Sequence, residues 1–404
     1  MKRASIFFFC ALFLSLTATA AYAGGFALYE WSSRGVAMGT TGYAFAGDAS
    51  VVATNPALMT KLEGGHVLGG FTLISPQSTV VVDGDKNKTK ANIHVVPHAY
   101  YTQQMGSNED VWLGFGLFTR YGLGTEYDHD WIGKGSLQQV LLESISFNPN
   151  IAFKLTDNLS LAVGVEVLKG GIKIKRNINI LGTDYQIDAD TEGYAFGGNL
   201  ALHYDVNDQW ALGLTYRAPM KMYTSGSAWN QRSGASTQDD QDIHATLPGS
   251  YTFAVGYQPM DEWTWEFDVV HTRWEHTDKM VYEGAVLNSE TPLHYKNTWR
   301  FQLGTEYWLK QWLALRFGYI YDQTPTRAGD ASFMLPANDR QLYSTGLGFK
   351  WDKWTADWSF MYVSAKSRHD LGIDDPNVPG GADWDVDFKD GKTWVTGVSL
   401  GYSF

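Results

Sequence analysis

The sequence WVTGVSLGYSF, residues 394–404, alternates strictly between two kinds of side chain along its whole length. Successive side chains of a β-strand point to opposite faces, so Trp394, Val398, Leu400 and Tyr402 would share one apolar face. The opposite face carries small or polar side chains such as Ser399. A soluble sheet can contain such a strand. A chain that ends on one, behind an export signal, is typical of the closing strand of an outer-membrane barrel.

The N-terminus has the three parts of a secretory signal. Lys2 and Arg3 precede an apolar run at 6–16, and Ala21-Tyr22-Ala23 forms a small-residue cleavage site. The apolar run is too short to cross a bilayer as a helix. We therefore expect residues 1–23 to be a cleaved signal peptide.

Cysteine content and charge exclude several classes of protein. The single cysteine, Cys10, lies within the signal, so the mature chain would have no disulfides, thiolate metal sites or cysteine nucleophiles. The net charge of −12 argues against a nucleic-acid partner. No apolar run approaches the roughly 20 residues of a spanning helix, so a membrane location would require a closed barrel.

The two-residue alternation recurs along the chain with one apolar face and one face that carries charge. A soluble sandwich would place the charged face in water, whereas a membrane barrel would place it in the lumen. We predict fourteen strands, with 12 or 16 as alternatives, at 64–75, 92–104, 109–121, 139–154, 159–176, 193–205, 209–219, 245–258, 262–280, 297–309, 311–323, 340–350, 353–366 and 393–404.

The lengths of the connections favour the barrel. Tight joints, as at 156–158 and 205–208, follow the even-numbered strands. Long polar connections follow odd-numbered strands, at 177–192, 220–244, 281–296, 324–339 and 367–392. This alternation is typical of short periplasmic turns and long extracellular loops. We predict an all-β fold, a 14-stranded antiparallel transmembrane β-barrel over residues 64–404.

Residues 24–63 do not follow the strand pattern. They are rich in Gly, Ala and Ser, with scattered aromatic residues. A disordered periplasmic arm is one reading, but the segment has too many apolar residues and too few charges to remain solvated. A 14-stranded barrel has a wide lumen, so we expect the segment to pack inside it.

Several short motifs occur in order along the chain and together resemble one known family. They are Ser32-Ser33-x-Gly35, Asn55-Pro56-Ala57-Leu58, Tyr121-Gly122-Leu123-Gly124-Thr125-Glu126, Leu247-Pro248, and Leu335-Pro336 through Asp339-Arg340. The chain resembles the FadL-type outer-membrane transporters of long-chain fatty acids and other hydrophobic compounds over nearly its whole mature length.

The resemblance implies an N-terminal hatch at 24–63 that contains the Asn55, Pro56 and Ala57 motif. It also implies an inward kink of the third strand, whose residues here are Tyr121, Gly122, Leu123 and Gly124. These glycines could instead simply begin a loop. Cargo would be captured at the extracellular side, enter an apolar pocket and leave through a gap in the wall.

The resemblance places the protein in the cell outer membrane of a Gram-negative bacterium. Its expected surroundings are outer-membrane lipid and lipopolysaccharide. Phe404 would be the signal read by the barrel assembly machinery, and we expect a monomer.

A fatty acid needs an apolar tunnel and a positive group for its carboxylate. Strand parity points Leu168, Ile172, Ile174 and Arg176 inward unless Gly170-Gly171 forms a bulge. The resemblance implies that Arg176 binds the headgroup; the alternative is a lumen charge paired with an acid.

The family's second headgroup cation, a lysine, is not matched here. Its position falls near Thr291, and the nearest bases are His294 and Lys296. Aromatic hydrocarbons therefore remain an alternative cargo, and a general porin or an outer-membrane lipase are alternatives of other classes.

The remaining lumen charges are expected to form structural pairs, because buried charges need partners. They are Arg217, Arg300, Arg316, Glu166, Glu266, Asp268, Glu306 and Asp357.

The sequence gives little indication of catalysis or cofactor binding. His94 and His98 share a face, as do His271 and Glu275, but no nucleophile is identified beside either pair. No phosphate loop or nucleotide fingerprint occurs. We expect no enzyme activity, no cofactor and no metal site.

Overall fold

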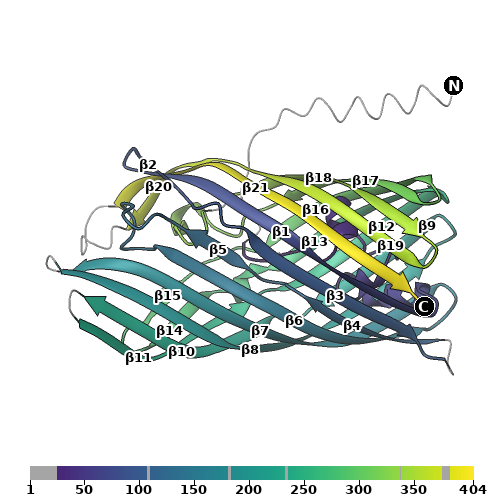
Figure 1. Cartoon of the computed structure of the whole chain (residues 1–404), viewed down its shortest axis with the longest axis horizontal. Coiled ribbons are helices and arrows are strands. Elements are labelled where there is room, and N and C mark those ends of the chain that lie inside the picture. The colour runs from purple at the N-terminus through teal and green to yellow at the C-terminus, as the bar shows by residue number, and fades with distance from the viewer. Residues whose placement is uncertain (1–24, 107–109, 181–182, 233–234, 337, 375–382) are drawn as a thin grey trace.

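The computed structural model describes residues 25–404 except 107–109, 181–182, 233–234, 337 and 375–382. The expected signal peptide lies outside the described residues. The chain forms one closed antiparallel barrel of 14 strands, as predicted (Figure 1).

The barrel positions are occupied, in chain order, by β1 (Gly65–Val82), β3 (His94–Gln104), β4 (Val111–Phe118), β6 (Gln139–Lys154), β7 (Leu159–Ile180), β8 (Thr183–Asp205), β9 (Trp210–Arg217), β12 (Gly249–Met260), β13 (Trp263–Arg273), β16 (Thr298–Lys310), β17 (Leu313–Asp322), β18 (Arg340–Trp351), β19 (Trp354–Ala365) and β21 (Asp383–Ser403). Further strands extend these at one end or cap their hairpins: β2 (Asp85–Lys88), β5 (Leu123–Glu126), β10 (Met220–Arg232), β11 (Ala235–Leu247), β14 (Lys279–Gly284), β15 (Ser289–Pro292) and β20 (Arg368–Asp374).

The last strand closes the barrel against the first. β21 pairs with β1 from His66 opposite Ser403 to Ser75 opposite Trp394, and with β19 on its other edge. The backbone N–H of Phe404 donates to the carbonyl of Gly65 at 2.8 Å. The predicted seam is therefore confirmed, and no free strand edge faces the membrane there.

The predicted parity of the strands is also confirmed. In β21, Trp394 and Leu400 are each 49% exposed, whereas Val395 and Ser399 are 1% and 4% exposed. The same holds around the barrel, where exposed apolar side chains form an outer belt that includes Phe71, Phe115, Phe147, Val165, Phe196, Leu214, Phe253, Phe267, Phe317, Trp358 and Val398.

Several predicted boundaries are wrong at the end of the barrel opposite the C-terminus. Four predicted loops, at 177–192, 220–244, 281–296 and 367–392, are largely strands that prolong the hairpins. Their polarity reflects exposure above the apolar belt rather than irregular structure. Cross-strand ion pairs such as Lys173 with Asp190 at 3.1 Å suit such exposed strands.

Two predicted strands are shorter than expected. The third strand ends at Phe118 rather than at 121, and the ninth ends at Arg273 rather than at 280. The ninth is followed by the 3₁₀ turn η3 (Trp274–His276). The connection at 324–339 is irregular, as predicted, and contains η4 (Ala328–Asp330).

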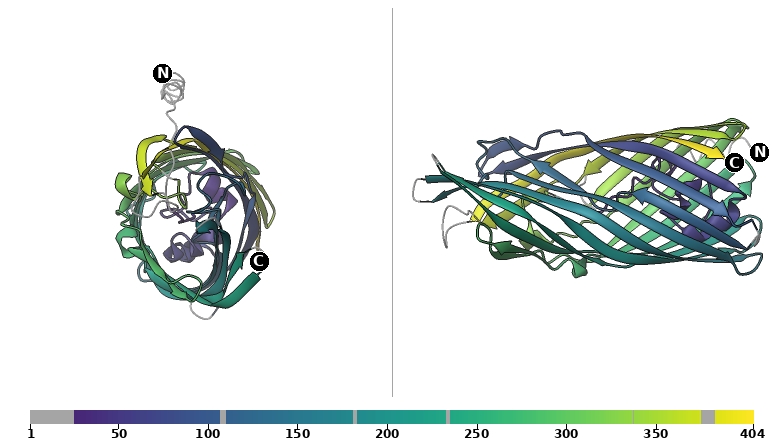
Figure 2. Two further views of the ribbon diagram at one scale, coloured as in Figure 1. Left: turned by 90° about the vertical axis from the view of Figure 1, so that its left-hand side faces the viewer. Right: turned by 60° about the horizontal axis from the view of Figure 1, so that its bottom comes forward.

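The N-terminal segment, residues 25–63, lies inside the lumen (Figure 2, left). It contains α2 (Ser33–Ala37), η1 (Ala49–Val52) and η2 (Pro56–Lys61). α2 packs against β17, β18, β19 and β21, whereas η2 packs against β4, β6, β7 and β8 on the other side of the lumen. None of the helices among the described residues is long and apolar enough to cross a membrane.

Each short helix of this segment begins at a capping residue. Ser32 Oγ accepts from the N–H of Gly35 at 3.0 Å, and Asp48 accepts from that of Ser50 at 2.7 Å. Isolated helices this short are unstable, so the caps and the surrounding barrel hold them.

Candidate functional site

The N-terminal segment is seated on glycines of the barrel wall. At each of several lumen-facing glycines, an added Cβ would lie 3.0 Å or less from an atom of the segment: Gly114, Gly213, Gly256, Gly304, Gly318, Gly346 and Gly397. At Gly318 the added atom would lie 2.0 Å from the backbone nitrogen of Gly39. Because backbone cannot swing aside, the segment and the wall fit at van der Waals contact.

A buried carboxylate fixes the middle of the segment. Glu266, on β13, is 1% exposed and accepts from four successive backbone N–H groups. The distances are 2.6, 2.5, 3.2 and 3.3 Å, from Gly42, Tyr43, Ala44 and Phe45 respectively. Hydrogen bonds to an ionised acceptor are the stronger kind, so Glu266 is a main attachment point.

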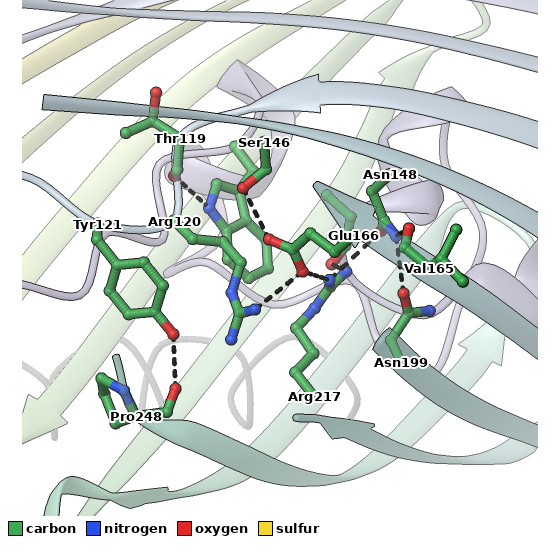
Figure 3. Close-up of polar contacts among 12 residues, drawn as sticks. Thr119, Arg120, Tyr121, Ser146, Asn148, Val165, Glu166, Asn199, Arg217 and Pro248 are labelled. Carbon is green, nitrogen blue, oxygen red and sulfur yellow. Dashed lines mark hydrogen bonds and ion pairs between the residues drawn. The ribbon is translucent and has the colours of Figure 1, made fainter. Parts of the chain in front are cut away.

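A second charged group joins the segment to the opposite wall (Figure 3). Glu166 accepts from Arg120 at 2.9 Å, from Arg217 at 3.2 Å and from Ser146 at 2.7 Å. Arg217 also donates to the carbonyl of Ala53 at 2.5 Å. The pairing expected for Glu166 and Arg217 is present, and its role includes holding the segment.

A third charged group lies near α2. Arg34 donates to both oxygens of Glu306 at 3.1 Å, and Arg316 bridges Glu306 at 2.6 Å and Asp357 at 2.5 Å. The expected pairing of Arg316, Glu306 and Asp357 is therefore present. Arg34 belongs to the N-terminal segment, so this group also joins the segment to the wall.

Of the eight lumen charges expected to be paired, three form no ion pair among the described residues: Glu266, which binds backbone N–H groups, and Asp268 and Arg300. Asp268 is fully buried, and neither carboxylate oxygen has a hydrogen-bond partner among the described residues. Arg300 is 3% exposed, with Nε and Nη1 also unpartnered within the described part of the chain. Its guanidinium instead lies 3.1 Å from the centre of the Tyr29 ring, a cation–π contact with the segment.

The Asn55-Pro56-Ala57 motif is an elbow between two parts of the segment. Asn55 is fully buried; its Oδ1 accepts from the N–H of Ala57 at 3.1 Å, while its Nδ2 donates to the carbonyls of Tyr43 and Leu202. Pro56 occupies the first position of η2, where its missing N–H costs nothing. The motif thus connects η2, the preceding loop and strand β8.

The chain leaves the barrel wall at the end of the third strand. After β4 ends at Phe118, the chain turns toward the lumen, and Tyr121 forms an antiparallel bridge with Ala27 of the segment. An added Cβ at Gly122 would lie 2.7 Å from Leu28, and one at Gly124 would lie 2.3 Å from the ring of His94. The absence of a side chain at these two glycines lets Leu28 and His94 approach the backbone closely. A glycine that only began a loop would not need such close neighbours.

The departure of this strand interrupts the ladder of the barrel. β3 pairs with β4 only from Ala99 onward, although β3 begins at His94. β6 pairs with β4 over Ser146–Phe153 and with β5 over Gln139–Leu142, which leaves residues 143–145 outside both ladders.

A cavity of about 690 Å³ lies at this interruption. Its lining includes Leu28 and Tyr121 of the interior, and Ile93 and Val95, which are 66% and 61% exposed on the outside. The cavity therefore has one wall in the lumen and another on the outer apolar surface.

A second cavity, of about 230 Å³, is lined by Arg176, the residue predicted to bind the headgroup. Arg176 lines it together with Ile174, Tyr282, Leu287 and Phe333. The Nε of Arg176 is buried without a hydrogen-bond partner among the described residues. The β7–β8 register is continuous through Gly170 and Gly171, so no bulge reverses the parity.

Arg176 lies beyond the apolar belt, because the outward face of β7 changes from Val165 and Val167 to Lys169 and Lys173. Burial lowers the pKa of the Arg176 guanidinium from its usual value. An arginine nevertheless stays charged at neutral pH. The guanidinium is partly buried and forms no ion pair with a carboxylate among the described residues, which favours an anionic partner from outside the chain.

The other predicted pocket residues lie in one apolar cluster. Leu168, Ile172 and Ile174 are 0%, 2% and 6% exposed, and all three point into the lumen. The cluster also contains Tyr121 at the kink and Phe333 in the Arg176 cavity. It is a continuous apolar region from one cavity toward the other.

Sequence reasoning missed one Ser–His contact. His98 Nε2 lies 2.8 Å from Ser399 Oγ, and these residues are 3% and 4% exposed. The serine also accepts from the N–H of Ser33. A closed strand pairing brings the two together from opposite ends of the sequence, so no local pattern could have indicated it.

A closed antiparallel barrel with an apolar outer belt and a lumen filled by its own N-terminal segment defines a class, the outer-membrane β-barrel transport proteins. Residues 14–404 match the family described as "Outer membrane protein transport protein (OMPP1/FadL/TodX)". The chain belongs to this family, and it is an outer-membrane protein.

Curated relatives cover nearly the whole chain. Outer membrane protein P1 of Haemophilus influenzae is 26% identical over 88% of this chain and 89% of the relative. The long-chain fatty acid transport protein of Escherichia coli (strain K12) is 24% identical over 98% of this chain and 97% of the relative.

Solved structures share the fold. A Pseudomonas aeruginosa FadL homologue superimposes with a TM-score of 0.84 at 17% identity, covering 94% of this chain and 100% of the other. The Pseudomonas putida toluene transporter TodX gives 0.74 at 18% identity, over 96% and 100% of the two chains.

Proposed function

We propose that this protein takes up long-chain fatty acids, or similar hydrophobic molecules with an anionic headgroup, by passive diffusion. Cargo enters the cavity at Arg176 and moves along the apolar cluster. It leaves through the wall between β3 and β6 into the membrane. The observation that carries this proposal is the interrupted ladder with a cavity that reaches both the lumen and the outer surface.

A lateral exit suits an apolar cargo. Transfer from an apolar cavity directly into lipid keeps the cargo's chain out of water, and each buried CH₂ is worth about 0.8 kcal/mol. A route straight through the lumen would have to displace the N-terminal segment, which carries many buried polar contacts with the wall.

The N-terminal segment acts in this proposal as a hatch. It fills the lumen beneath the cavities, and its residues Leu28 and Tyr29 lie beside the kink and beside Arg300. Rearrangement of Leu28 against Gly122 is the step that would widen the path between cavity and wall.

Arg176 is proposed to receive the headgroup. It is the charged side chain in the lining of its cavity, which otherwise consists of apolar and neutral polar residues. Burial raises the pKa of Tyr282 to about 12, so its hydroxyl stays protonated and can donate a hydrogen bond to a carboxylate.

The test is equilibrium binding of oleate to purified protein, comparing wild type with Arg176→Gln. We expect at least a tenfold loss of oleate affinity, because a charge-assisted contact is worth about 1.5–3 kcal/mol. Arg273→Gln is the matched control, since Arg273 forms an exposed pair with Glu275 at 2.7 Å outside both cavities. Unchanged oleate binding in Arg176→Gln would remove the headgroup role.

Aromatic hydrocarbons are the alternative cargo, because two of the structural relatives are described as toluene transporters. Toluene binding that is independent of Arg176, without oleate binding, would assign that cargo. Steady conductance of the wild type in planar bilayers would indicate a general porin. Ester hydrolysis that is lost in Ser399→Ala would indicate a lipase.

The surroundings of the protein form part of the proposal. We propose a monomer in contact with outer-membrane lipid and lipopolysaccharide, since the outer apolar belt already faces lipid on all sides. Phe404, whose side chain is 61% exposed at the end of the closing strand, is proposed to be recognised by the barrel assembly machinery.

A further inference from the structure

A group of three potential metal ligands lies on the outer face of the barrel, and none of the three lines either cavity. Asp242 and His244 are on β11, and Glu283 is on the adjacent strand β14. One donor atom from each side chain lies within 4.8 Å of the other two. Their strand neighbours Gln241 and Ile243 are buried toward the lumen, so the three side chains point outward.

The strand register places this group at the upper edge of the apolar belt. Tyr194, Tyr223 and His244 are directly opposite one another on β8, β10 and β11. The two tyrosines are each 54% exposed, and Phe196 below them is 70% exposed. A row of outward tyrosines marks the interface between hydrocarbon and headgroups in such barrels.

The next row along the same strands is charged. Asp242 lies opposite Glu283, and in this row Glu192 pairs with Lys169 at 2.7 Å. The three-ligand group therefore spans the boundary, with its imidazole in the aromatic row and its carboxylates one row further out. This is the level of the lipid headgroups and their phosphates.

The separation of one donor pair fits two ligands of a single metal ion. His244 Nε2 and Glu283 Oε2 lie 3.4 Å apart. Two ligands about 2.1 Å from the centre of a tetrahedron are separated by roughly 3.4 Å. The same separation is longer than the ~2.7–3.2 Å of an ordinary N–H···O hydrogen bond.

The ligand types narrow the choice of ion. Imidazole nitrogen favours zinc and other late transition metals, whereas magnesium and calcium favour sites built from oxygen alone. Three protein ligands leave at least one position of a zinc ion open. Glu283 is 62% exposed and faces outward, so an ion held by the three residues would be accessible from the headgroup layer.

We propose that Asp242, His244 and Glu283 bind a divalent transition-metal ion, zinc in particular, whose open position accepts a phosphate oxygen. The cation also offsets local charge, since Asp242 and Glu283 carry carboxylates where lipid phosphates are negative. The site departs from our expectation of no metal. It does not depend on the cargo proposed for the lumen.

The first experiment titrates Zn²⁺ into full-length protein in detergent, freed of metal by a chelator, with calorimetry as the readout. We expect one zinc ion per chain for the wild type. We expect affinity to fall by at least about tenfold in His244→Ala and in Asp242→Asn, since even outer-shell changes cost that much.

Asp240→Asn is the matched control, because Asp240 is an exposed acid on the same face of β11, two residues from Asp242, and is not among the three ligands. It should leave zinc affinity unchanged. Absence of stoichiometric zinc binding by the wild type, or equal affinity in His244→Ala, would overturn the site. The heat-dependent shift of the folded barrel on gels, measured for His244→Ala, provides an independent check of folding.

The phosphate position is tested with the zinc-loaded wild type and lipid A in its phosphorylated and dephosphorylated forms, and with inorganic phosphate alone. Zinc-dependent retention of phosphorylated lipid A only would support a headgroup ligand. Equal competition by inorganic phosphate would assign free phosphate, and retention independent of zinc would overturn the phosphate part.

Discussion

Replacement of Glu266 by alanine should release the N-terminal segment from the wall. The carboxylate accepts from the N–H groups of Gly42, Tyr43, Ala44 and Phe45 at 2.5–3.3 Å, in a site that is 1% exposed. Each buried donor left without a partner costs about 1–3 kcal/mol.

Water entering the vacated space would satisfy some of these donors. If two of the four remain unsatisfied, the seated state loses roughly 2–6 kcal/mol. At about 1.4 kcal/mol per factor of ten, the population with a displaced segment rises by roughly 30-fold to 10⁴-fold. Glu266→Gln keeps one acceptor oxygen and should give a smaller effect.

The assay is conductance in planar bilayers together with protease protection of the segment. We expect the wild type to be nearly insulating, Glu266→Ala to show frequent open events, and its segment to be cleaved faster. Glu262→Ala, an exposed acid earlier on the same hairpin, is the control. If Glu266→Ala is as insulating and as protected as the wild type, the attachment role is refuted.

Three further predictions concern the fit of the N-terminal segment against the barrel wall, the proposed exit between β3 and β6, and assembly of the barrel. Gly318→Ala places a methyl group 2.0 Å from the backbone of Gly39 and should lower stability by about 1–3 kcal/mol in a urea titration, whereas Gly69→Ala, whose nearest neighbouring atom is 4.0 Å away, should be neutral. Gly124→Val should displace the ring of His94 and slow oleate uptake by cells while leaving oleate binding at Arg176 intact; an unchanged uptake rate would argue against exit at this position. Deletion of Phe404 should reduce the amount of barrel assembled in cells without preventing refolding in detergent, as judged by the heat-dependent shift on gels; equal assembly in cells would exclude the proposed recognition.

Most of the fold could be predicted from the two-residue alternation of apolar and small or polar side chains. Large apolar side chains at one parity and small or charged ones at the other were enough to orient Trp394, Val395 and Ser399 correctly, because strand parity is a local property of the backbone. The same reasoning oriented Arg176 toward the lumen. It failed at 177–192, where polar residues above the membrane continue as strands.

The candidate site was only partly predictable. The family resemblance implied a kink at Tyr121–Gly124, but the close approach of Leu28 to Gly122 and of His94 to Gly124 involves distant parts of the chain. Sequence identified Glu166 and Glu266 equally as lumen charges. The structure gives them different tasks, one pairing with arginines and the other binding backbone N–H groups.

The sequence by itself determined the strands of the barrel wall, their parity and the closing role of residues 394–404, because these follow from local two-residue periodicity. Only the tertiary structure decided which lumen charges are paired, where the ladder opens, and that Asp242, His244 and Glu283 meet on the outer face. Those features depend on strand register and on the segment that fills the lumen, and both are set by contacts between residues far apart in the chain.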